Sequence, residues 1–354
     1  MTPVEIRTSS SRYDALVGSN LLDTIGEVVS QHLRLGRCAI VTDTNVAPLF
    51  ADRVSRSLAA VGFQSTVIKI PPGEKSKSLA EAGAICDQLI AARLDRSSFL
   101  VALGGGVVGD LAGFVAAIYQ RGIPYVQAPT TLLAQVDSSI GGKTAVNTAT
   151  GKNLIGALHH PVVVIADVDV LQTLPPRELN QGFAEIIKHA IICDAELFEM
   201  LEDLDRKNFE QLVKRNVAIK AQFVAADERD ETGRRALLNF GHTVGHAVES
   251  AGEYHDLLHG EAVSLGIVAA CDISVRKAGL PEAQRLKVIS LLERFGLPTR
   301  LPANISREKV LRALPLDKKF ERWQVRFVVT PAIGSARIAS DVSIEDIAQA
   351  VMML

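Results

Sequence analysis

The first half of the chain alternates short apolar runs with longer segments in which apolar residues recur every three or four positions. The short runs are rich in β-branched residues and predict strands over 37–42, 65–70, 99–103, 125–128 and 162–166. The longer segments predict crossover helices over 45–61, 79–93 and 107–119. This alternation is typical of an open parallel sheet with helices on both faces, so we predict a Rossmann-like α/β domain.

The pattern becomes helical after Leu174, where two prolines follow. Apolar residues at helical spacing predict helices over 177–193, 194–204, 208–226, 237–250, 258–278, 281–295 and 306–313. A small hairpin is predicted late in the chain, with strands over 325–329 and 336–338. We therefore place a boundary at the proline pair, between an α/β domain over 1–174 and a mainly α-helical domain over 175–354.

Composition and charge exclude several classes of protein. The 38 Lys and Arg residues against 40 Asp and Glu leave a formal net charge of −2, which argues against a nucleic-acid partner. No apolar run reaches the roughly 18–20 residues of a bilayer span, and residues 1–13 lack the charged start and apolar core of a secretion signal. We expect a cytoplasmic protein that acts on a small molecule and has no membrane partner.

A glycine-rich turn follows the predicted strand over 99–103. Gly104, Gly105 and Gly106 precede a helix, and such a turn lets the backbone approach a phosphate at the helix start. The spacing is not that of the Gly-x-Gly-x-x-Gly fingerprint, and a tight strand-to-helix turn explains the glycines equally well. Asp43, at the end of another predicted strand, either accepts bonds from a ribose or caps the next helix.

The histidines are concentrated in one part of the chain, because five of the eight lie within residues 185–261. His242 and His246 are four residues apart and share a helix face, while His259 precedes another apolar helix. Glu185 and Lys188 share a face of a third helix. A carboxylate and two imidazoles from separate helices can hold a zinc-like ion. The alternative is that these histidines form hydrogen bonds within a core.

One stretch carries a resemblance to a known family. Residues 127–147 read QAPTTLLAQVDSSIGGKTAVN, and this segment closely resembles 3-dehydroquinate synthase. Shorter matches follow in the family's order: PGEKSK from Pro72, GGGVVGD from Gly104, KNLIG from Lys152, EIIK from Glu185, LNFGHTVGH from Leu238, LHGEAV from Leu258 and DKK from Asp317. The resemblance implies an NAD-binding α/β domain and a helical C-terminal domain, with the active site between them.

The resemblance also implies roles for individual residues. It makes Glu185, His242 and His259 the ligands of a divalent metal ion, Zn or Co. It implies that NAD is held by Asp43, Pro72, Gly73, Glu74, Lys75, Ser76, Lys77, Gly105, Gly106, Val107, Val108, Gly109, Asp110, Thr130, Thr131, Lys143, Lys152, Val170, Leu171, Gln172 and Thr173.

Residues for the substrate follow in the same way. The family's substrate groups match Asp137, Lys143, Lys152, Asn153, Lys188, Lys220, Glu231, Arg235, Asn239, His246 and one lysine of the pair Lys318 and Lys319, of which we take Lys318. An arginine matching Arg121 reaches the neighbouring subunit in the family, which implies a homodimer. The segment over 227–235 is one residue longer than usual, so Asp230 competes with Glu231 for the acidic position, and Glu231 keeps the family's spacing to Arg235.

The reaction implied by the resemblance is conversion of 3-deoxy-D-arabino-heptulosonate 7-phosphate, a sugar phosphate, into 3-dehydroquinate and phosphate. NAD would be reduced and reoxidised within one cycle. Three alternatives stay open: a metal-dependent NAD polyol dehydrogenase, another sugar phosphate cyclase, and a non-catalytic relative that binds NAD and metal.

Overall fold

A computed structural model describes residues 2–149, 151–204, 209–252, 256–314, 320–321 and 324–354, with the backbone alone at 320–321 and 324–325. The chain divides into two compact units. The first unit contains Met1–Leu174 and Phe209–Ala225, and the second contains Pro175–Asn208 and Ala226–Leu354. The helix over 209–225 thus groups with the α/β part although it comes later in the sequence.

A sheet of seven strands forms the centre of the first unit. All five predicted strands are present within a residue or two of their expected bounds, and they form a parallel array. Two N-terminal strands that the sequence pattern did not predict extend it, one parallel and one antiparallel at the edge. The order across the sheet is β1 (Val4–Arg7), β2 (Arg12–Gly18), β9 (Val163–Asp167), β6 (Tyr125–Pro129), β5 (Phe99–Gly104), β3 (Arg37–Asp43) and β4 (Gln64–Ile70).

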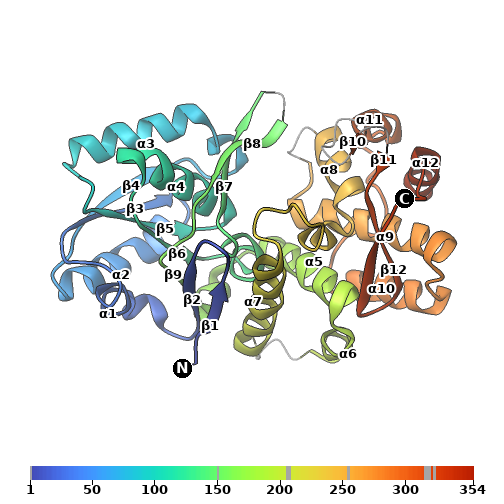
Figure 1. Cartoon of the computed structure of the whole chain (residues 1–354), viewed down its shortest axis with the longest axis horizontal. Coiled ribbons are helices and arrows are strands. Elements are labelled where there is room, and N and C mark those ends of the chain that lie inside the picture. Colours follow the sequence, from blue (N-terminus) through green and yellow to red (C-terminus); the bar gives the residue numbers. More distant parts are fainter. Residues whose placement is uncertain (1, 150, 205–208, 253–255, 315–319, 322–323) are drawn as a thin grey trace. The chain divides into compact units, whose positions relative to one another are not determined.

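Helices cover both faces of this sheet, as Figure 1 shows. Alternate residues of a strand point to opposite faces. Ile40 and Val101 pack with α1 (Ile25–Ser30) and α2 (Ala47–Ala60) on one face. Val41 and Ala102 pack with α3 (Leu79–Ala91) and α4 (Gly106–Ile118) on the other. Two buried faces explain why the central strands are almost continuously apolar.

Further elements of the first unit carry predicted site residues. A hairpin of β7 (Lys143–Thr148) and β8 (Gly151–Leu158) was not predicted, and it forms the green arrows at the top of Figure 1. A π-helical turn covers Ala134–Ser138, and 3₁₀ turns cover Glu74–Ser76 and Val168–Thr173. The helix α7 (Phe209–Ala226) completes this group.

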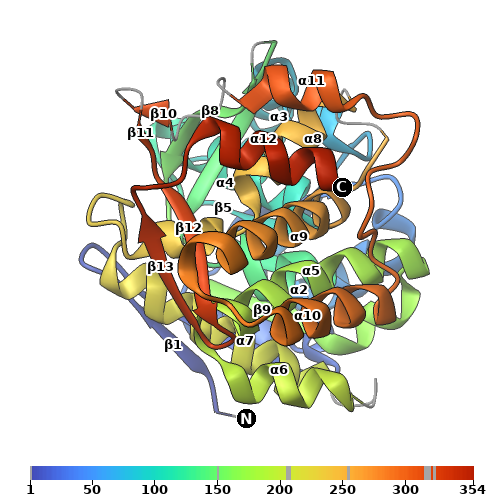
Figure 2. The same cartoon turned by 90° about the vertical axis from the view of Figure 1, so that its right-hand side faces the viewer.

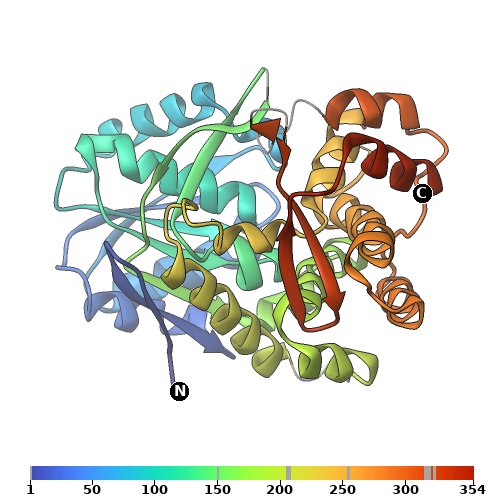
Figure 3. The same ribbon diagram turned by 45° about the vertical axis from the view of Figure 1, so that its right-hand side comes forward.

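The second unit is mainly helical. Its helices are α5 (Pro176–Cys193), α6 (Ala195–Glu202), α8 (His242–Ala251), α9 (His259–Ala278), α10 (Glu282–Arg294), α11 (Arg307–Ala313) and α12 (Ile344–Met353). The long helix α9 packs against α5, α8, α10 and α12, as Figure 2 shows. The predicted late hairpin is present as β12 (Phe327–Ala332) and β13 (Ser335–Ala339), the long red arrows of Figure 3. A further short pair joins β10 (Phe320–Glu321) to β11 (Gln324–Val325).

One helix of the second unit begins later than predicted. The expected helix over 237–250 is divided into a 3₁₀ turn over Arg235–Asn239 and helix α8, which starts at His242. The break falls at Gly241, whose φ of 79° is left-handed and suits glycine. The break places His242 in the first turn of its helix. Among the described residues, no helix is long and apolar enough to cross a membrane.

Candidate functional site

In the first unit, the predicted nucleotide residues gather at one edge of the sheet. Asp43 ends β3, the loop over 72–77 follows β4, Gly105 follows β5, Thr130 follows β6, and the turn containing Val170 follows β9. These strands are parallel, so their carboxyl ends share one edge. The chain passes from β3 outward to β4 and then back across β3 to β5. Such a reversal is the usual ligand position of open α/β sheets.

The glycine turn after β5 allows a close approach between strand and helix. A Cβ atom on Gly104 would lie 2.6 Å from a methyl carbon of Val108, and one on Gly109 would lie 2.8 Å from the side chain of Gln127. Helix α4 begins at Gly106, and its first backbone N–H groups lie at the sheet edge. The turn therefore has the packing role foreseen as an alternative, and it also leaves a helix start suited to a phosphate.

Asp43 and Thr131 cap the turns that they begin. The Asp43 carboxylate accepts hydrogen bonds from the N–H groups of Asn45 at 2.8 Å and Val46 at 2.9 Å. Thr131 Oγ1 accepts one from the N–H of Ala134 at 3.2 Å. Asp43 therefore holds the turn before α2, whose N-cap is Val46 and has no side-chain cap, and a contact of the Asp43 carboxylate with a ribose stays a prediction.

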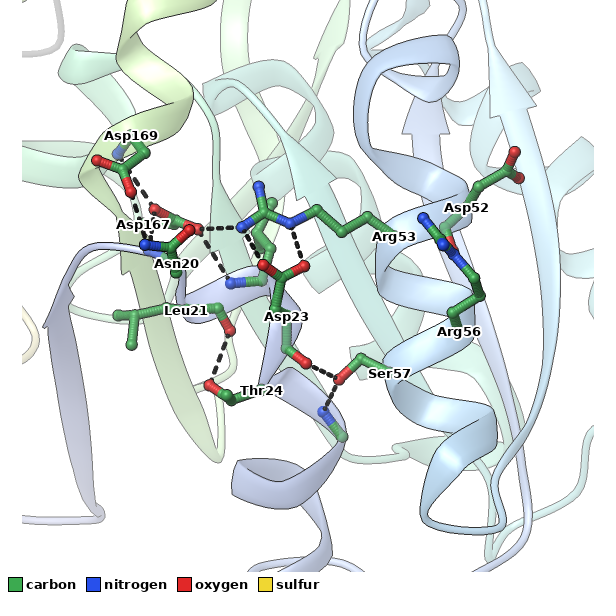
Figure 4. Close-up of polar contacts among 12 residues, drawn as sticks. Asn20, Leu21, Asp23, Thr24, Asp52, Arg53, Arg56, Ser57, Asp167 and Asp169 are labelled. Atoms are coloured by element: carbon green, nitrogen blue, oxygen red, sulfur yellow. Dashed lines mark hydrogen bonds and ion pairs between the residues drawn. The ribbon is translucent and has the colours of Figure 1, made fainter.

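A buried carboxylate holds the turn that contains Val170 to Thr173. Asp167, at the end of β9, accepts from the backbone N–H groups of Asn20, Leu22 and Asp169 at 3.1, 3.0 and 3.1 Å. Figure 4 shows these bonds together with Arg53, whose guanidinium lies 3.5 Å from Asp167 and also pairs with Asp23. Burial raises the pKa of Asp167, and the backbone donors and Arg53 oppose that effect. The network fixes the backbone of this turn.

A half-buried carboxylate, that of Asp110, pairs with a lysine beside the glycine turn. The Lys77 ammonium contacts Asp110 and donates to Asn153 Oδ1 at 2.5 Å. Burial raises the pKa of Asp110, against the opposing charge of Lys77. Lys152 lies 4.0 Å from Glu74. Thus residues from the loop after β4, from α4 and from the β7–β8 hairpin meet in one polar cluster.

The other predicted substrate residues of the first unit lie in different surroundings. The Lys220 ammonium on α7 pairs with the carboxylate of Asp137 in the π-helical turn. Lys143 is exposed at the start of β7. Arg121 is also exposed, and its φ of 70° is left-handed.

In the second unit, the three predicted metal ligands come together. Glu185 on α5, His242 on α8 and His259 on α9 each offer a ligand atom, and these atoms lie within 4.8 Å of one another. The Nε2 atoms of His242 and His259 lie 3.4 and 3.6 Å from Glu185 Oε1. Lys188, one turn along α5, pairs with the other oxygen of Glu185.

The outer nitrogen of each histidine is occupied by a protein oxygen. Nδ1 of His242 lies 3.2 Å from the carbonyl oxygen of Phe240, and Nδ1 of His259 lies 3.3 Å from a carboxylate oxygen of Glu249. Such contacts hold the ring and leave Nε2 to face a metal. Glu249 was not predicted from the sequence. It lies seven residues after His242, on the same face of α8, and that spacing is a signal that could have identified it.

Glycines bring these helices close enough for the three ligands to meet. A Cβ atom on Gly266 of α9 would lie 1.8 Å from the carbonyl oxygen of Gly241, and one on Gly260 would lie 2.0 Å from that of Gln181. Backbone therefore contacts backbone where α9 meets the start of α8 and helix α5. The glycines beside His242 and His259 in the sequence are required by this packing.

Burial and charge act together on the protonation of the cluster. Burial would raise the pKa of Glu185, but Lys188 and the two histidines hold it well below its usual range. Burial and Lys188 lower the pKa of His242 well below its usual range, so its ring is neutral. Burial also lowers the pKa of His259, yet Glu249 and Glu185 outweigh it and raise the pKa to about 10. A metal ion in this cluster competes with that proton.

The predicted substrate residues of the second unit differ in how far they are buried. His246 is exposed, with its ring centroid 5.3 Å from that of His242. Arg235 is buried and donates to the carbonyl oxygen of Glu228 at 2.6 Å. Asn239 is half-buried at the end of the 3₁₀ turn, and Glu231 is exposed. Lys318, Lys319 and His255 lie outside the described residues.

A single aspartate, Asp227, holds the loop that leads from α7 to the 3₁₀ turn at Arg235. The Asp227 carboxylate accepts hydrogen bonds from the backbone N–H groups of Glu231, Thr232, Gly233 and Arg235 at 2.8–3.2 Å. Burial would raise the pKa of Asp227, but these backbone donors lower it to about 2. Asp227 was not predicted from the sequence, because its partners are backbone groups.

The fold and the two sets of residues define the class: an α/β unit with a candidate nucleotide-binding edge, together with a helical unit that carries a candidate metal centre. Comparison with known proteins identifies the family within that class. The family described as 3-dehydroquinate synthase N-terminal matches residues 67–181, and the one described as 3-dehydroquinate synthase C-terminal matches residues 182–320. The chain belongs to the 3-dehydroquinate synthase family.

Full-length relatives agree with this assignment. The 3-dehydroquinate synthase of Desulforamulus reducens is 44% identical, covering 98% of each chain. That of Symbiobacterium thermophilum is 47% identical, covering 94% of this chain and 95% of the relative.

Solved structures show the same fold. A 2-epi-5-epi-valiolone synthase from Streptomyces hygroscopicus, with NAD⁺ and Zn²⁺ bound, matches with a TM-score of 0.88 at 29% identity over 96% of each chain. A glycerol dehydrogenase from Schizosaccharomyces pombe matches with a TM-score of 0.65 at 16% identity, over 96% of this chain and 88% of that one. The second likeness concerns the fold alone.

Proposed function

We propose that this chain converts 3-deoxy-D-arabino-heptulosonate 7-phosphate into 3-dehydroquinate and phosphate, and thus acts as a carbon-oxygen lyase that uses NAD and a divalent metal ion. The observation that carries the proposal is its likeness to full-length 3-dehydroquinate synthases at 44–47% identity. The NAD polyol dehydrogenase is less well supported, because the glycerol dehydrogenase is only 16% identical.

The metal cluster fits a zinc-like or cobalt ion in its donor set. One carboxylate and two imidazoles are a common ligand set of catalytic zinc sites, which keep a position open for substrate. Phe240 and Glu249 hold the outer nitrogens of His242 and His259, so Nε2 of each ring is directed to the cluster. Lys188 lies beside Glu185 and supplies a positive charge next to the ion.

The carboxyl edge of the sheet fits NAD. The start of α4 would hold the pyrophosphate, with Gly105 and Gly106 leaving the backbone accessible. Asp43 and the turn containing Val170 would contact the remainder of the cofactor. When bound, NAD accepts a hydride from carbon 5 of the substrate and later returns it, while the metal polarises the hydroxyl group at that carbon.

The remaining side chains bind and orient a strongly anionic substrate. Lys152, Lys188 and Arg121 would give charge-assisted hydrogen bonds to its phosphate and carboxylate. Asn239 and His246 would bind hydroxyl groups. Lys143, Lys220, Glu231, Arg235, Lys318 or Lys319, and Asn153 complete the proposed substrate set. The Asp137–Lys220 pair places a hydrogen-bond acceptor and a donor together, and a substrate hydroxyl could bond to both.

We further propose that the chain forms a homodimer in the cytoplasm. Three large apolar side chains of β8 are exposed, with Leu154 at 44%, Ile155 at 37% and Leu158 at 39% of their full accessible area. A second copy of the chain would cover them and receive Arg121. Sedimentation equilibrium tests this assembly, and a monomer at micromolar concentration would contradict it.

The function is tested by incubating the protein with the heptulosonate phosphate, NAD and zinc, and by measuring both phosphate and 3-dehydroquinate. We expect both products in equal amounts. Glu185→Ala and His259→Ala should each lose the bound metal together with at least about 1,000-fold in turnover. An active variant without metal would refute the ligand assignment, and a folded, metal-loaded wild-type protein without product would favour the non-catalytic relative.

A further inference from the structure

Asn147 lies in β7, within the stretch that resembles the family, and it has no role in the reaction proposed above. Its side chain lies between two groups of proposed site residues. Nδ2 donates to the carboxylate of Glu74 at 2.7 Å, and Oδ1 accepts from the backbone N–H of Asn153 at 3.0 Å. The backbone N–H of Asn147 donates to the carbonyl oxygen of Lys77 at 2.8 Å.

These bonds form part of a closed ring. Lys77 and Glu74 belong to the loop after β4, while Asn153 lies on β8. Lys77 returns to Asn153 through its ammonium group, which donates to Asn153 Oδ1 at 2.5 Å. The loop assigned to NAD and the hairpin assigned to the substrate are thus joined by the side chains of both Asn147 and Lys77. The Asn147–Lys77 backbone bond and the contact of Lys152 with Glu74 add to these links.

The chemistry of the ring requires an amide at position 147. Glu74 offers only an acceptor, and the Asn153 N–H offers only a donor. A side-chain amide supplies one group of each kind. An aspartate would place a second carboxylate against Glu74, and an alanine would leave both partners without this contact.

The ring also holds an unusual backbone conformation. Asn153 has a φ of 55°, in the left-handed region that asparagine tolerates better than most residues. Its N–H is bound by Asn147 and its side chain by Lys77, so both contacts help to hold this turn and the adjacent Lys152.

We propose that Asn147 is a positioning residue that couples the NAD loop to the phosphate-binding hairpin. The proposal rests on the proposed function, because that function assigns NAD to Glu74 and Lys77 and the sugar phosphate to Lys152 and Asn153. When NAD binds, it orders the loop, and the bonds of Asn147 then order the hairpin. Since such coupling is reciprocal, the phosphorylated substrate tightens NAD binding by the same factor.

Calorimetric titration of the metal-loaded protein with NAD tests the coupling, in the absence and in the presence of a saturating phosphonate analogue of the substrate that cannot release phosphate. We expect the analogue to tighten NAD binding by ~5-fold or more in the wild type. In Asn147→Ala and Asn147→Ser this factor should fall, because only the links through Lys77 and Lys152 remain. The control Thr148→Ala removes a bond to the Gly151 carbonyl oxygen on the same hairpin and should keep the wild-type factor.

The outcomes separate this proposal from the proposed function. A wild type without coupling, or an Asn147 variant that keeps the full factor, overturns the role of Asn147 even if turnover is normal. If Asn147→Ala does not fold, Asn147→Ser serves for the same test, because the short serine hydroxyl cannot bridge Glu74 and Asn153. Absence of turnover in a wild type that shows the coupling would instead refute the reaction.

Discussion

The proposed nucleotide edge of the first unit and the candidate metal cluster of the second are assembled in different ways. At the sheet edge, each parallel strand delivers a short loop, and the α4 start offers backbone N–H groups. In the helical unit, three helices each deliver one candidate ligand side chain to the same point. The first arrangement follows from strand order, whereas the second depends on how closely the helices pack.

This difference predicts unequal tolerance to substitution. A loop at a sheet edge can shift by a few tenths of an ångström while the strands stay paired. A cluster whose donor atoms lie within 4.8 Å of one another loses its geometry when one helix moves. Interiors at close packing transmit such strain instead of absorbing it.

Matched glycine substitutions give the largest expected effect. In Gly266→Ala the new methyl group meets the backbone carbonyl of Gly241, which cannot move without displacing α8. We expect a loss of at least about 3 kcal/mol in unfolding free energy and loss of bound metal. Gly109→Ala meets the end of the Gln127 side chain, so about 1 kcal/mol is expected.

Chemical denaturation and metal analysis measure both effects. Gly83→Ala is the control, because a Cβ atom there contacts nothing within 4 Å and its helix favours alanine. Equal losses in Gly266→Ala and Gly109→Ala would contradict the contrast between the two regions.

Truncation of Glu249 should have the next largest effect. Its carboxylate holds the ring of His259 without being one of the three ligands. We expect Glu249→Ala to weaken metal binding about 10- to 100-fold, and Glu249→Gln to weaken it less, because the amide oxygen still accepts a hydrogen bond.

Competition with a chelator measures this affinity, and the visible absorption of the cobalt-loaded protein reports the ligand geometry. Lys188 keeps its partner Glu185 in both variants. An unchanged affinity and spectrum in Glu249→Ala would show that Glu249 does not orient His259.

The last expected effect is at Asp227, and it depends on pH. Its pKa is lowered to about 2 in the folded protein from 3.8 in the unfolded chain, so its stabilising contribution is full above pH 3.8 and disappears as the pH falls through about 2. Asp227→Asn should cost about 2 kcal/mol near neutral pH.

The difference in unfolding free energy between wild type and Asp227→Asn, measured against pH, checks this prediction. It should shrink below pH 3.8. A difference that stays constant to pH 2 would mean that the carboxylate charge does not hold the loop.

The central strands were predictable because both of their faces are buried, which makes them continuously apolar. The strands β7 and β8 were missed for the opposite reason. β7 carries polar residues, and β8 exposes Leu154 and Ile155, so neither shows the expected pattern. Helix α8 began later than predicted because the break at Gly241 interrupts an otherwise helical spacing.

For the candidate site, the ligands Glu185, His242 and His259 could be assigned through the resemblance. Residues that position other parts of the site were not predicted, because their partners are known only from the three-dimensional structure. Asp227 binds backbone N–H groups, and Asn147 joins Glu74 to Asn153 across more than seventy positions of the chain.

The central claim is that NAD acts within the cycle and is restored, and the molar ratio of products to NAD tests it most directly. With NAD far below the substrate concentration and the metal site loaded, phosphate release should continue through many equivalents of NAD, without net accumulation of NADH. Release of phosphate that stops at one equivalent of NAD, or NADH that accumulates in step with substrate loss, would contradict the account and favour a dehydrogenase.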